Sequence, residues 1–358
     1  MFMSKYWSDL AHRLDPYTPG EQPKEQGLIK LNTNENPYPP SPKVHAVFSQ
    51  ANIDDLRLYP DPESSLLKQS IAQFYHLDEA QVFVGNGSDE VLAAAFQAFF
   101  AGDKPLLMPD ITYSFYTVYC SLYDIDSCEL PLADDFSINL AQYCSESMQD
   151  NGGVVFANPN APSSLALSLA EIEQLLLKNT ESVVLVDEAY VDFGAQSAAS
   201  LVNQYPNLLV VQTLSKSRSL AGLRVGFALG NQALIYGLNR VKNSFNPYPL
   251  DRLAERAAAA AIDDVDYFND CCQKIIATRE WVTAQLAALG FEMLDSKTNF
   301  VMAKPTGIAA EDLFAQLRQH KIIVRYFNKP RISEYLRISI GTDQEMQALI
   351  TAIKEILG

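Results

Sequence analysis

The sequence is poor in the residues that build disulfide frameworks and metal sites. Its five cysteines include no C-x-x-C pair and leave one over, and its four histidines are scattered without metal-ligand spacing. These patterns disfavour both a secreted disulfide scaffold and a zinc site. We therefore expect reduced thiols, a cytoplasmic protein and no bound metal.

Basic charge is also scarce. The chain has 27 Lys+Arg against 43 Asp+Glu, a formal net charge of −16. Nucleic acids and anionic membranes are bound through clustered positive charge, so neither is expected as a partner. The most apolar stretches, 91–101 and 257–262, are too short to cross a bilayer, and the first residues lack the apolar core of a signal peptide. An anionic ligand would therefore need a few local groups, such as arginines and helix N-termini.

Proline interrupts roughly the first forty residues, which we interpret as an extended arm with little room for helix. From about Leu66 onward, short apolar runs alternate with helical patterns. This alternation predicts a mostly parallel sheet covered by helices. The predicted strands are 82–84, 106–108, 154–156, 183–186, 208–213 and 225–229, and the helices between them include 88–100 and 169–177.

A second, smaller α+β unit is predicted after a helical region at 250–289, which ends at Gly290. Its pattern gives strands 300–303, 322–324 and 336–340 and helices 309–320 and 343–357. The predicted α/β fold therefore has three parts. Residues 1–45 form an arm that partly joins the small domain, 46–260 form the large domain, and 261–358 form the small domain.

Ligands of open parallel sheets bind beyond the carboxyl ends of the strands. The segment Gly85-Asn86-Gly87-Ser88-Asp89-Glu90 follows one predicted strand and opens a helix. Its glycines permit a tight turn, and free backbone N–H groups at the helix start favour an anion, most usefully a phosphate. An ordinary capped strand–helix turn is the alternative interpretation.

Three further strand ends or starts carry polar residues. Asp187 ends an apolar strand, where a carboxylate needs a partner, and Tyr190 follows three residues later. Lys216 lies among small polar residues after another strand, which suits a Schiff-base nucleophile. Arg224 lies between small residues and is able to reach a phosphate. Taken singly, each also fits a capping aspartate, a packed tyrosine, a solvated lysine or a surface ion pair.

Together these residues match one cofactor, pyridoxal 5′-phosphate (PLP). PLP needs a lysine for covalent attachment, an anion at its ring nitrogen, donors for its phenolate oxygen O3′ and a phosphate cradle. The freed lysine is then able to move a proton as general base and acid.

The motifs that carry a family resemblance run in one order from Leu31 to Thr342: LNTNENPYPPSP, LYPDP, GNGSDE, PDITYSFY, VDEAYVDF, TLSKSRSLAGLRVGF, SKTNFV and YLRISIGT. The whole chain resembles the fold-type I PLP-dependent aminotransferases, and in particular the histidinol-phosphate aminotransferase family. The resemblance implies that Lys216 forms the Schiff base, Asp187 pairs with the ring nitrogen and Tyr190 donates to O3′. It further implies the remaining cofactor contacts: the turn at Gly87, backbone N–H groups of Ser88 and Asp89, Ser215 and Arg224 at the phosphate, and Tyr113 stacked on the ring.

The resemblance also implies a homodimer with shared sites, because Tyr59 would reach the cofactor phosphate of the neighbouring subunit. Arg337 is the position that grips the anionic group of the substrate. Arg325, Tyr17 and Asn34 would complete a pocket for a phosphorylated substrate.

One motif departs from the family pattern S-P-N-N-P-T-G. The chain reads Asn158-Pro159-Asn160-Ala161-Pro162-Ser163-Ser164, so Ala161 replaces the asparagine that helps to hold O3′ and Ser164 replaces a glycine. The lost hydrogen bond costs about 0.5–1.5 kcal/mol unless Asn160 supplies it, which tunes the site without abolishing catalysis.

The resemblance favours transamination of L-histidinol phosphate with 2-oxoglutarate, giving imidazole acetol phosphate and L-glutamate in histidine biosynthesis. Two arginines suit this reaction because guanidinium groups bind both phosphates and carboxylates. An aromatic amino-acid aminotransferase is the nearest alternative, followed by a PLP-dependent decarboxylase of a phosphorylated amino acid. A PLP-binding protein without turnover conflicts with the intact set of polar residues, and a transcription regulator would need a basic helix-turn-helix.

Overall fold

The computed structural model describes residues 4–18 and 20–358. Its larger sheet has seven strands in the order β2-β8-β7-β6-β5-β3-β4. Only β8 runs antiparallel to its neighbours, which confirms the mostly parallel sheet. The strands are β2 (Val82–Gly85), β3 (Leu106–Pro109), β4 (Ser127–Leu130), β5 (Gly153–Ala157), β6 (Val184–Asp187), β7 (Leu208–Thr213) and β8 (Gly226–Gly230).

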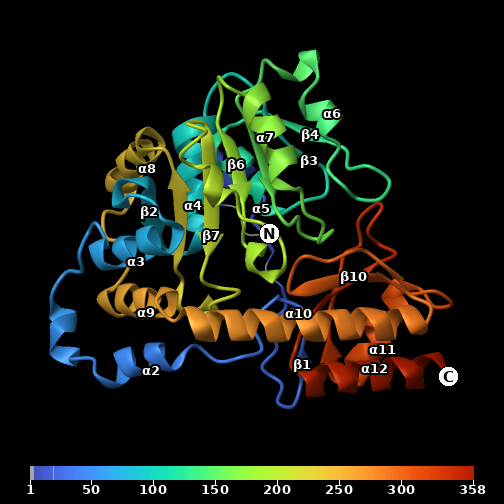
Figure 1. The fold of residues 1–358 in the computed structure, drawn as a ribbon. Helices are drawn as coiled ribbons and strands as arrows, with labels where there is room; N and C mark the ends of the chain where they lie inside the picture. The colour runs from blue at the N-terminus through green and yellow to red at the C-terminus, as the bar shows by residue number, and fades with distance from the viewer. Residues whose placement is uncertain (1–3, 19) are drawn as a thin grey trace.

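Helices cover both faces of this sheet (Figure 1). Alternation along a strand divides its side chains between the faces, so Val184 and Val186 of β6 join one core and Leu185 the other. The first core is closed by α2 (Pro42–Ser49), α3 (Ser65–Tyr75), α7 (Leu169–Lys178) and α9 (Arg252–Ile262). The second is closed by α4 (Gly87–Ala95), α5 (Phe115–Tyr123) and α8 (Gln232–Phe245).

The smaller unit is built on a four-stranded antiparallel sheet in the order β12-β13-β10-β9. Its strands are β9 (Glu292–Met293), β10 (Phe300–Lys304), β12 (Arg325–Tyr326) and β13 (Leu336–Ser339). The long helix α10 (Val265–Ala288) packs against β10 and α12 (Asp343–Leu357), with α11 (Ala310–Gln319) beside them (Figure 1). The arm joins this unit through β1 (Ile29–Lys30), which pairs in parallel with β11 (Ile322–Ile323).

Two details differ from the sequence interpretation. The region 250–289 is two helices, because the chain turns at Asp263 and Asp264 between α9 and α10. The arm also contains a short helix, α1 (Asp9–Arg13), which forms in a stretch that has no proline and whose N-cap Ser8 accepts a hydrogen bond from the Ala11 backbone N–H. The remaining α-helix of the described chain is α6 (Leu140–Tyr143).

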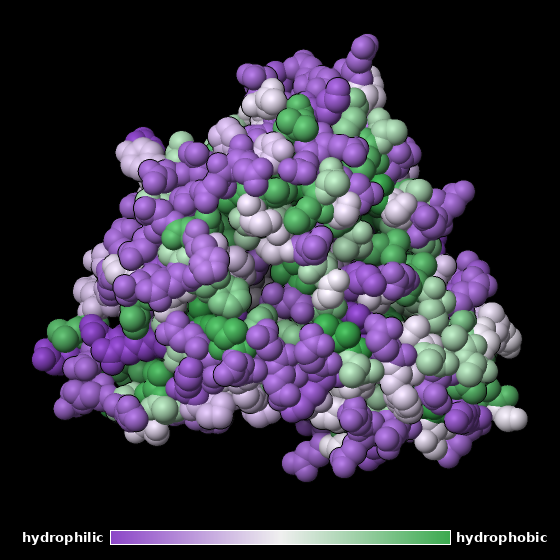
Figure 2. All heavy atoms as spheres, viewed as in Figure 1, coloured by the Kyte–Doolittle hydropathy of each residue, from purple (hydrophilic) through white to green (hydrophobic). Residues whose placement is uncertain are grey.

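Hydrophilic residues cover most of the face shown in Figure 2. Hydrophobic side chains show between them at the lower left, where Figure 1 places α2 and the segment that follows it. Exposed apolar residues of this region include Phe48, Ile53, Leu56 and Leu58. Within residues 4–18 and 20–358, no helix has the length and apolar character needed to span a membrane.

Candidate active site

The polar residues singled out in the sequence meet at one edge of the large sheet. β2, β6 and β7 point the same way, so their carboxyl ends lie at that edge. Asp187 ends β6, Lys216 follows β7, and Gly87 opens α4 directly after β2. The topology therefore gathers residues that are far apart in the sequence, as expected for ligand sites of such sheets.

Asp187 is a buried carboxylate, 4% exposed. Its oxygens accept hydrogen bonds from the Tyr116 hydroxyl at 2.8 Å and from the Ala189 backbone N–H at 3.2 Å. Burial raises the pKa of Asp187 to about 6, against the lowering effect of these two donors. No cationic side chain of the described chain pairs with it. The site therefore fits a cationic group, such as a protonated ring nitrogen, that neutralises the buried anion.

Lys216 is half-buried, and the N-terminal arm holds it. Its Nζ donates to the Thr33 carbonyl oxygen at 3.3 Å and lies 5.7 Å from the centre of the Tyr190 ring. The Asn36 side-chain amide donates to the Lys216 carbonyl oxygen at 3.0 Å. The arm thus fixes both the backbone and the amine of this lysine.

Tyr190 is held by the arm and by the small unit. The Asn34 amide donates to its hydroxyl oxygen at 3.0 Å, and the Ser339 hydroxyl donates to Asn34 Oδ1 at 2.9 Å. The Tyr190 ring packs edge-on against Phe300 of β10. The two units and the arm therefore meet at this tyrosine.

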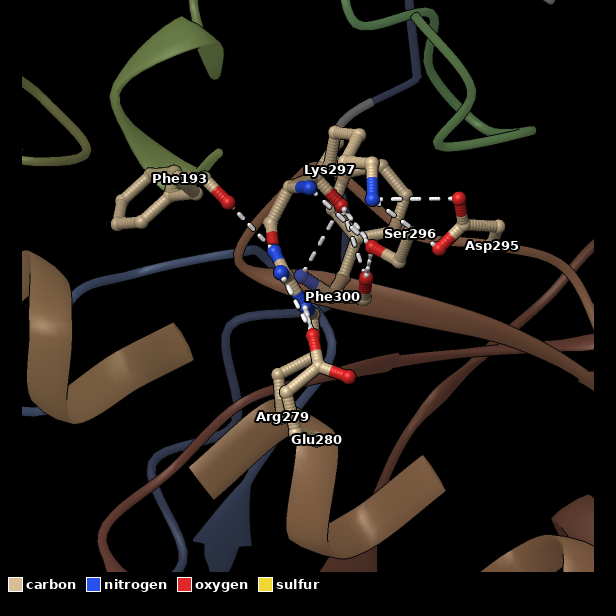
Figure 3. Close-up of polar contacts among 8 residues, drawn as sticks. Phe193, Arg279, Glu280, Asp295, Ser296, Lys297 and Phe300 are labelled. Carbon is tan, nitrogen blue, oxygen red and sulfur yellow. Dashed lines mark hydrogen bonds and ion pairs between the residues drawn. The ribbon is translucent and has the colours of Figure 1, made fainter. Parts of the chain in front are cut away.

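Arg279 of α10 fastens the turn that follows Tyr190 (Figure 3). One of its guanidinium nitrogens donates to the Phe193 carbonyl oxygen at 2.6 Å and to the Thr298 carbonyl oxygen at 2.8 Å. Arg279 is only 3% exposed. Its buried guanidinium therefore links the large unit, at Phe193, to the segment that leads into β10, at Thr298.

The turn before α4 forms a tight cradle. Gly87 has φ +79°, and a Cβ atom there would lie 2.5 Å from Nη2 of Arg224. A Cβ on Gly226 would lie 2.3 Å from the Ser88 backbone nitrogen, so glycine is required at both positions. The start of α4 and the Arg224 guanidinium therefore lie together, which suits an anion such as phosphate.

Polar side chains close this cradle. Arg224 pairs with Asp89 at 3.1 Å, and the Tyr113 hydroxyl donates to the other Asp89 oxygen at 3.0 Å. Burial, with the Asp89 charge, raises the pKa of Tyr113, which therefore stays a neutral hydroxyl donor. The Ser215 hydroxyl accepts from Thr213 at 2.9 Å and is buried next to Lys216.

Arg337 and Arg325 lie opposite each other on β13 and β12. Arg337 donates to the Asn32 carbonyl oxygen at 2.8 Å, while its buried Nε has no partner among the described residues. Burial lowers the pKa of Arg337, and the Arg325 charge lowers it further. Tyr17 lies nearby, with its ring 4.9 Å from that of Phe115. The pair has the character of an anion site.

The variant loop at 158–164 is held by hydrogen bonds within the loop and to the segment 111–112. Asn160 accepts from Thr112 and donates to the Ile111 carbonyl oxygen and to Ser163, at 2.8–3.0 Å. Ala161 precedes a cis peptide bond. Ser164 is fully buried with φ +68°, a conformation natural to the glycine of the family motif. In this structure the Asn160 amide is therefore already engaged, so a contact with O3′ requires it to exchange one of these hydrogen bonds.

Tyr59 lies outside this cluster. Its side chain is 79% exposed and its ring stacks on Tyr248 at 4.9 Å. A role at a cofactor therefore requires another subunit.

The sequence interpretation missed Tyr116, Thr33 and Asn36. Tyr116 is the last residue of the motif PDITYSFY, three residues after Tyr113, which precedes α5, but its contact with Asp187 spans 71 residues. Thr33 acts through its backbone, which no side-chain pattern identifies. Asn36 lies in the arm motif NENP, but its contact with Lys216 spans 180 residues.

This sheet order, with a smaller α+β unit and a lysine after β7, defines a fold-type I transferase. Solved structures agree on the fold. A histidinol-phosphate aminotransferase from Sinorhizobium meliloti, in complex with pyridoxal-5′-phosphate, gives a TM-score of 0.87 at 24% identity and covers 99% of this chain and 98% of that one. An L-threonine-O-3-phosphate decarboxylase from Porphyromonas gingivalis gives 0.76 at 22% identity and covers 92% and 99%.

The sequence comparisons are more specific. The family model for aminotransferase class I and II matches residues 26–353. The chain is 61% identical to histidinol-phosphate aminotransferase 1 of Hydrogenovibrio crunogenus over 99% of both chains. It is 56% identical to histidinol-phosphate aminotransferase of Acinetobacter baylyi over 98% of this chain and 97% of that one. The chain belongs to the aminotransferase class I and II family, among its histidinol-phosphate aminotransferases, which confirms the resemblance.

Proposed function

We propose that this enzyme uses PLP to transfer the amino group of L-histidinol phosphate to 2-oxoglutarate, giving imidazole acetol phosphate and L-glutamate in histidine biosynthesis. The observation that carries the substrate assignment is the Arg325–Arg337 pair, which has no carboxylate partner in the described chain. Relatives at 56–61% identity bear the name of this activity.

The residues at the sheet edge fit PLP. The buried, cation-free Asp187 suits the protonated ring nitrogen, and the cradle at Gly87 and Arg224 suits the phosphate. Lys216 is the amine for covalent attachment, and the Tyr190 hydroxyl would hold O3′. We assign further cofactor contacts to Ser88, Asp89, Tyr113, Asn160 and Ser215.

PLP supplies an aldehyde that bonds the substrate amine and a ring that withdraws electrons from the substrate Cα. Lys216, once released, would take the proton from the substrate Cα and return it at C4′, the aldehyde carbon of the cofactor, as general base and acid. Asp187 keeps the ring nitrogen cationic, and Tyr190 orients the ring. The arginine pair orients the substrate through its anionic end.

The same two arginines are proposed to serve both half-reactions. Guanidinium groups bind phosphate and carboxylate in the same bidentate manner, so one pocket accepts histidinol phosphate and then 2-oxoglutarate. Tyr17 and Asn34 would line this pocket. Arg337 is half-buried and donates to Asn32, so it is held in place before the substrate arrives.

We further propose a homodimer in which Tyr59 completes the site of the partner subunit. Its exposure, and the exposed apolar residues beside it, support this assembly. The arm at 1–45, the large domain at 46–260 and the small domain at 261–358 are proposed as the working units. Because a phosphorylated substrate does not cross membranes unaided, we place the reaction in the cytoplasm.

Steady-state kinetics with three amine substrates test this proposal. The proposal predicts the highest kcat/KM with L-histidinol phosphate and 2-oxoglutarate. A higher value with phenylalanine would indicate the aromatic aminotransferase. Release of CO₂ from threonine phosphate would indicate a decarboxylase, an activity that the shared fold alone does not exclude.

A further inference from the structure

Tyr116 of α5 is in direct contact with Asp187. Its side chain is fully buried, and its hydroxyl donates to Asp187 Oδ2 at 2.8 Å. The ring is fixed on two sides, stacked on Phe96 at 6.0 Å and edge-on to Tyr113 at 5.6 Å. The hydroxyl is therefore aimed at the carboxylate by rigid packing.

Tyr116 is a permanent donor to this carboxylate. Burial and the negative charge of Asp187 both raise the pKa of its phenol, so the hydroxyl stays protonated at any working pH. The Ala189 backbone N–H donates to the other carboxylate oxygen. Asp187 thus has one donor on each oxygen, which stabilises its ionised form and fixes the plane of the carboxylate.

We propose that Tyr116 is a positioning residue that keeps Asp187 ionised and oriented toward the ring nitrogen of the cofactor. The inference rests on the proposed use of PLP and adds a residue to which no cofactor or substrate contact is assigned. It also gives a role to the hydroxyl of a side chain that is fully buried in the core between the sheet and α4, α5 and α8.

Loss of the Tyr116 hydroxyl is expected to change how strongly the cofactor ring withdraws electrons. Without the phenol, Asp187 becomes a stronger base, and the proton shared with the ring nitrogen lies closer to the carboxylate oxygen. The ring then withdraws electrons less strongly, so removal of the substrate proton slows. Substrate binding is unaffected, because the arginine pair lies on a different unit.

The test compares Tyr116→Phe with the full-length wild-type enzyme, both loaded with PLP that carries ¹⁵N in its ring. We expect the ¹⁵N resonance of the variant to move toward the position of unprotonated pyridine. We also expect kcat to fall about tenfold with KM within about twofold, as for loss of one hydrogen bond to a charged group.

Tyr119→Phe is the matched control. Tyr119 lies on the same helix, is 3% exposed, and donates at 2.8 Å to the Asp89 backbone carbonyl oxygen. A purely structural role for Tyr116 predicts that both variants lose similar stability while the ¹⁵N resonance of each matches wild type, and that result overturns the inference. The ¹⁵N readout needs no substrate, so a shifted resonance supports the role of Tyr116 even if histidinol phosphate proves not to be the amine donor. Failure to bind PLP at all in the wild-type chain would instead defeat the proposed function.

Discussion

Arg325 lies directly across from Arg337 on the antiparallel strands β12 and β13, so two guanidinium side chains share one face of the small sheet. Like charges placed directly opposite each other are destabilising in a sheet. An anionic substrate bound between the proposed pair would relieve this repulsion, and substrate binding would then stabilise the small sheet.

Arg325→Gln is therefore expected to stabilise the free enzyme slightly, by roughly 0.5 kcal/mol, and to raise KM for histidinol phosphate about tenfold or more. Thermal unfolding without substrate and steady-state kinetics measure the two effects. Lys354→Gln, an exposed change on α12, controls for net charge. Equal KM values for Arg325→Gln and wild type would remove Arg325 from the substrate site.

Asp187 is expected to make the free energy of unfolding of the cofactor-free protein depend on pH. Its folded-state pKa is raised from 3.8 to about 6, so the folded state holds more protons than the unfolded state between these values. The free energy of unfolding therefore falls as pH rises through that window, by at most about 3 kcal/mol from this group.

Asp187→Asn removes this slope and is expected to be more stable than wild type at neutral pH by roughly 1–3 kcal/mol, while binding PLP more weakly. Asparagine is able to accept from Ala189 and donate to the Tyr116 oxygen. Urea unfolding of both cofactor-free proteins across pH measures the difference. If the free energies of unfolding of the two proteins changed in parallel with pH, burial of Asp187 would not raise its pKa and the prediction would be wrong.

Ser164 stores backbone strain at a glycine position of the family motif. Its φ of +68° costs an L-residue roughly 1–2 kcal/mol. Ser164→Gly and Ser164→Ala both remove the hydroxyl, but only glycine relieves the backbone. We expect the glycine variant to be more stable than the alanine variant by about 1 kcal/mol, despite its greater unfolded-state entropy. The reverse order in thermal unfolding would contradict the strained conformation.

Tyr59 is expected to act across a dimer. Lys216→Ala should be inactive, and Tyr59→Phe should release PLP more readily than wild type. Mixed dimers of the two variants contain one site with both residues intact, so mixing should restore part of the activity. Tyr6→Phe, an exposed tyrosine of the arm, provides the control. Activity no higher than the sum of the separate variants would place Tyr59 outside the partner site.

The sequence predicts the large sheet well, because its strands are apolar runs with little ambiguity; β7 matches its predicted bounds and β2, β3, β5, β6 and β8 differ by one residue at one or both ends. Short strands such as β12 carry no periodicity and were not predicted. Motifs identify Lys216 and Asp187, because the chemistry requires these residue types at strand ends. Tyr116 was missed because its partner lies 71 residues away. The opposition of Arg325 and Arg337 depends on strand register, which the local sequence does not specify.

The most direct test of the proposed reaction is an absorbance titration of the PLP-loaded enzyme with L-histidinol phosphate in the absence of any amino acceptor. We expect the absorbance of the pyridoxal form to be replaced by that of the pyridoxamine form, and 2-oxoglutarate then to restore the original spectrum. A spectrum that ignores histidinol phosphate but responds to glutamate and phenylalanine would contradict the substrate assignment while leaving the aminotransferase chemistry in place.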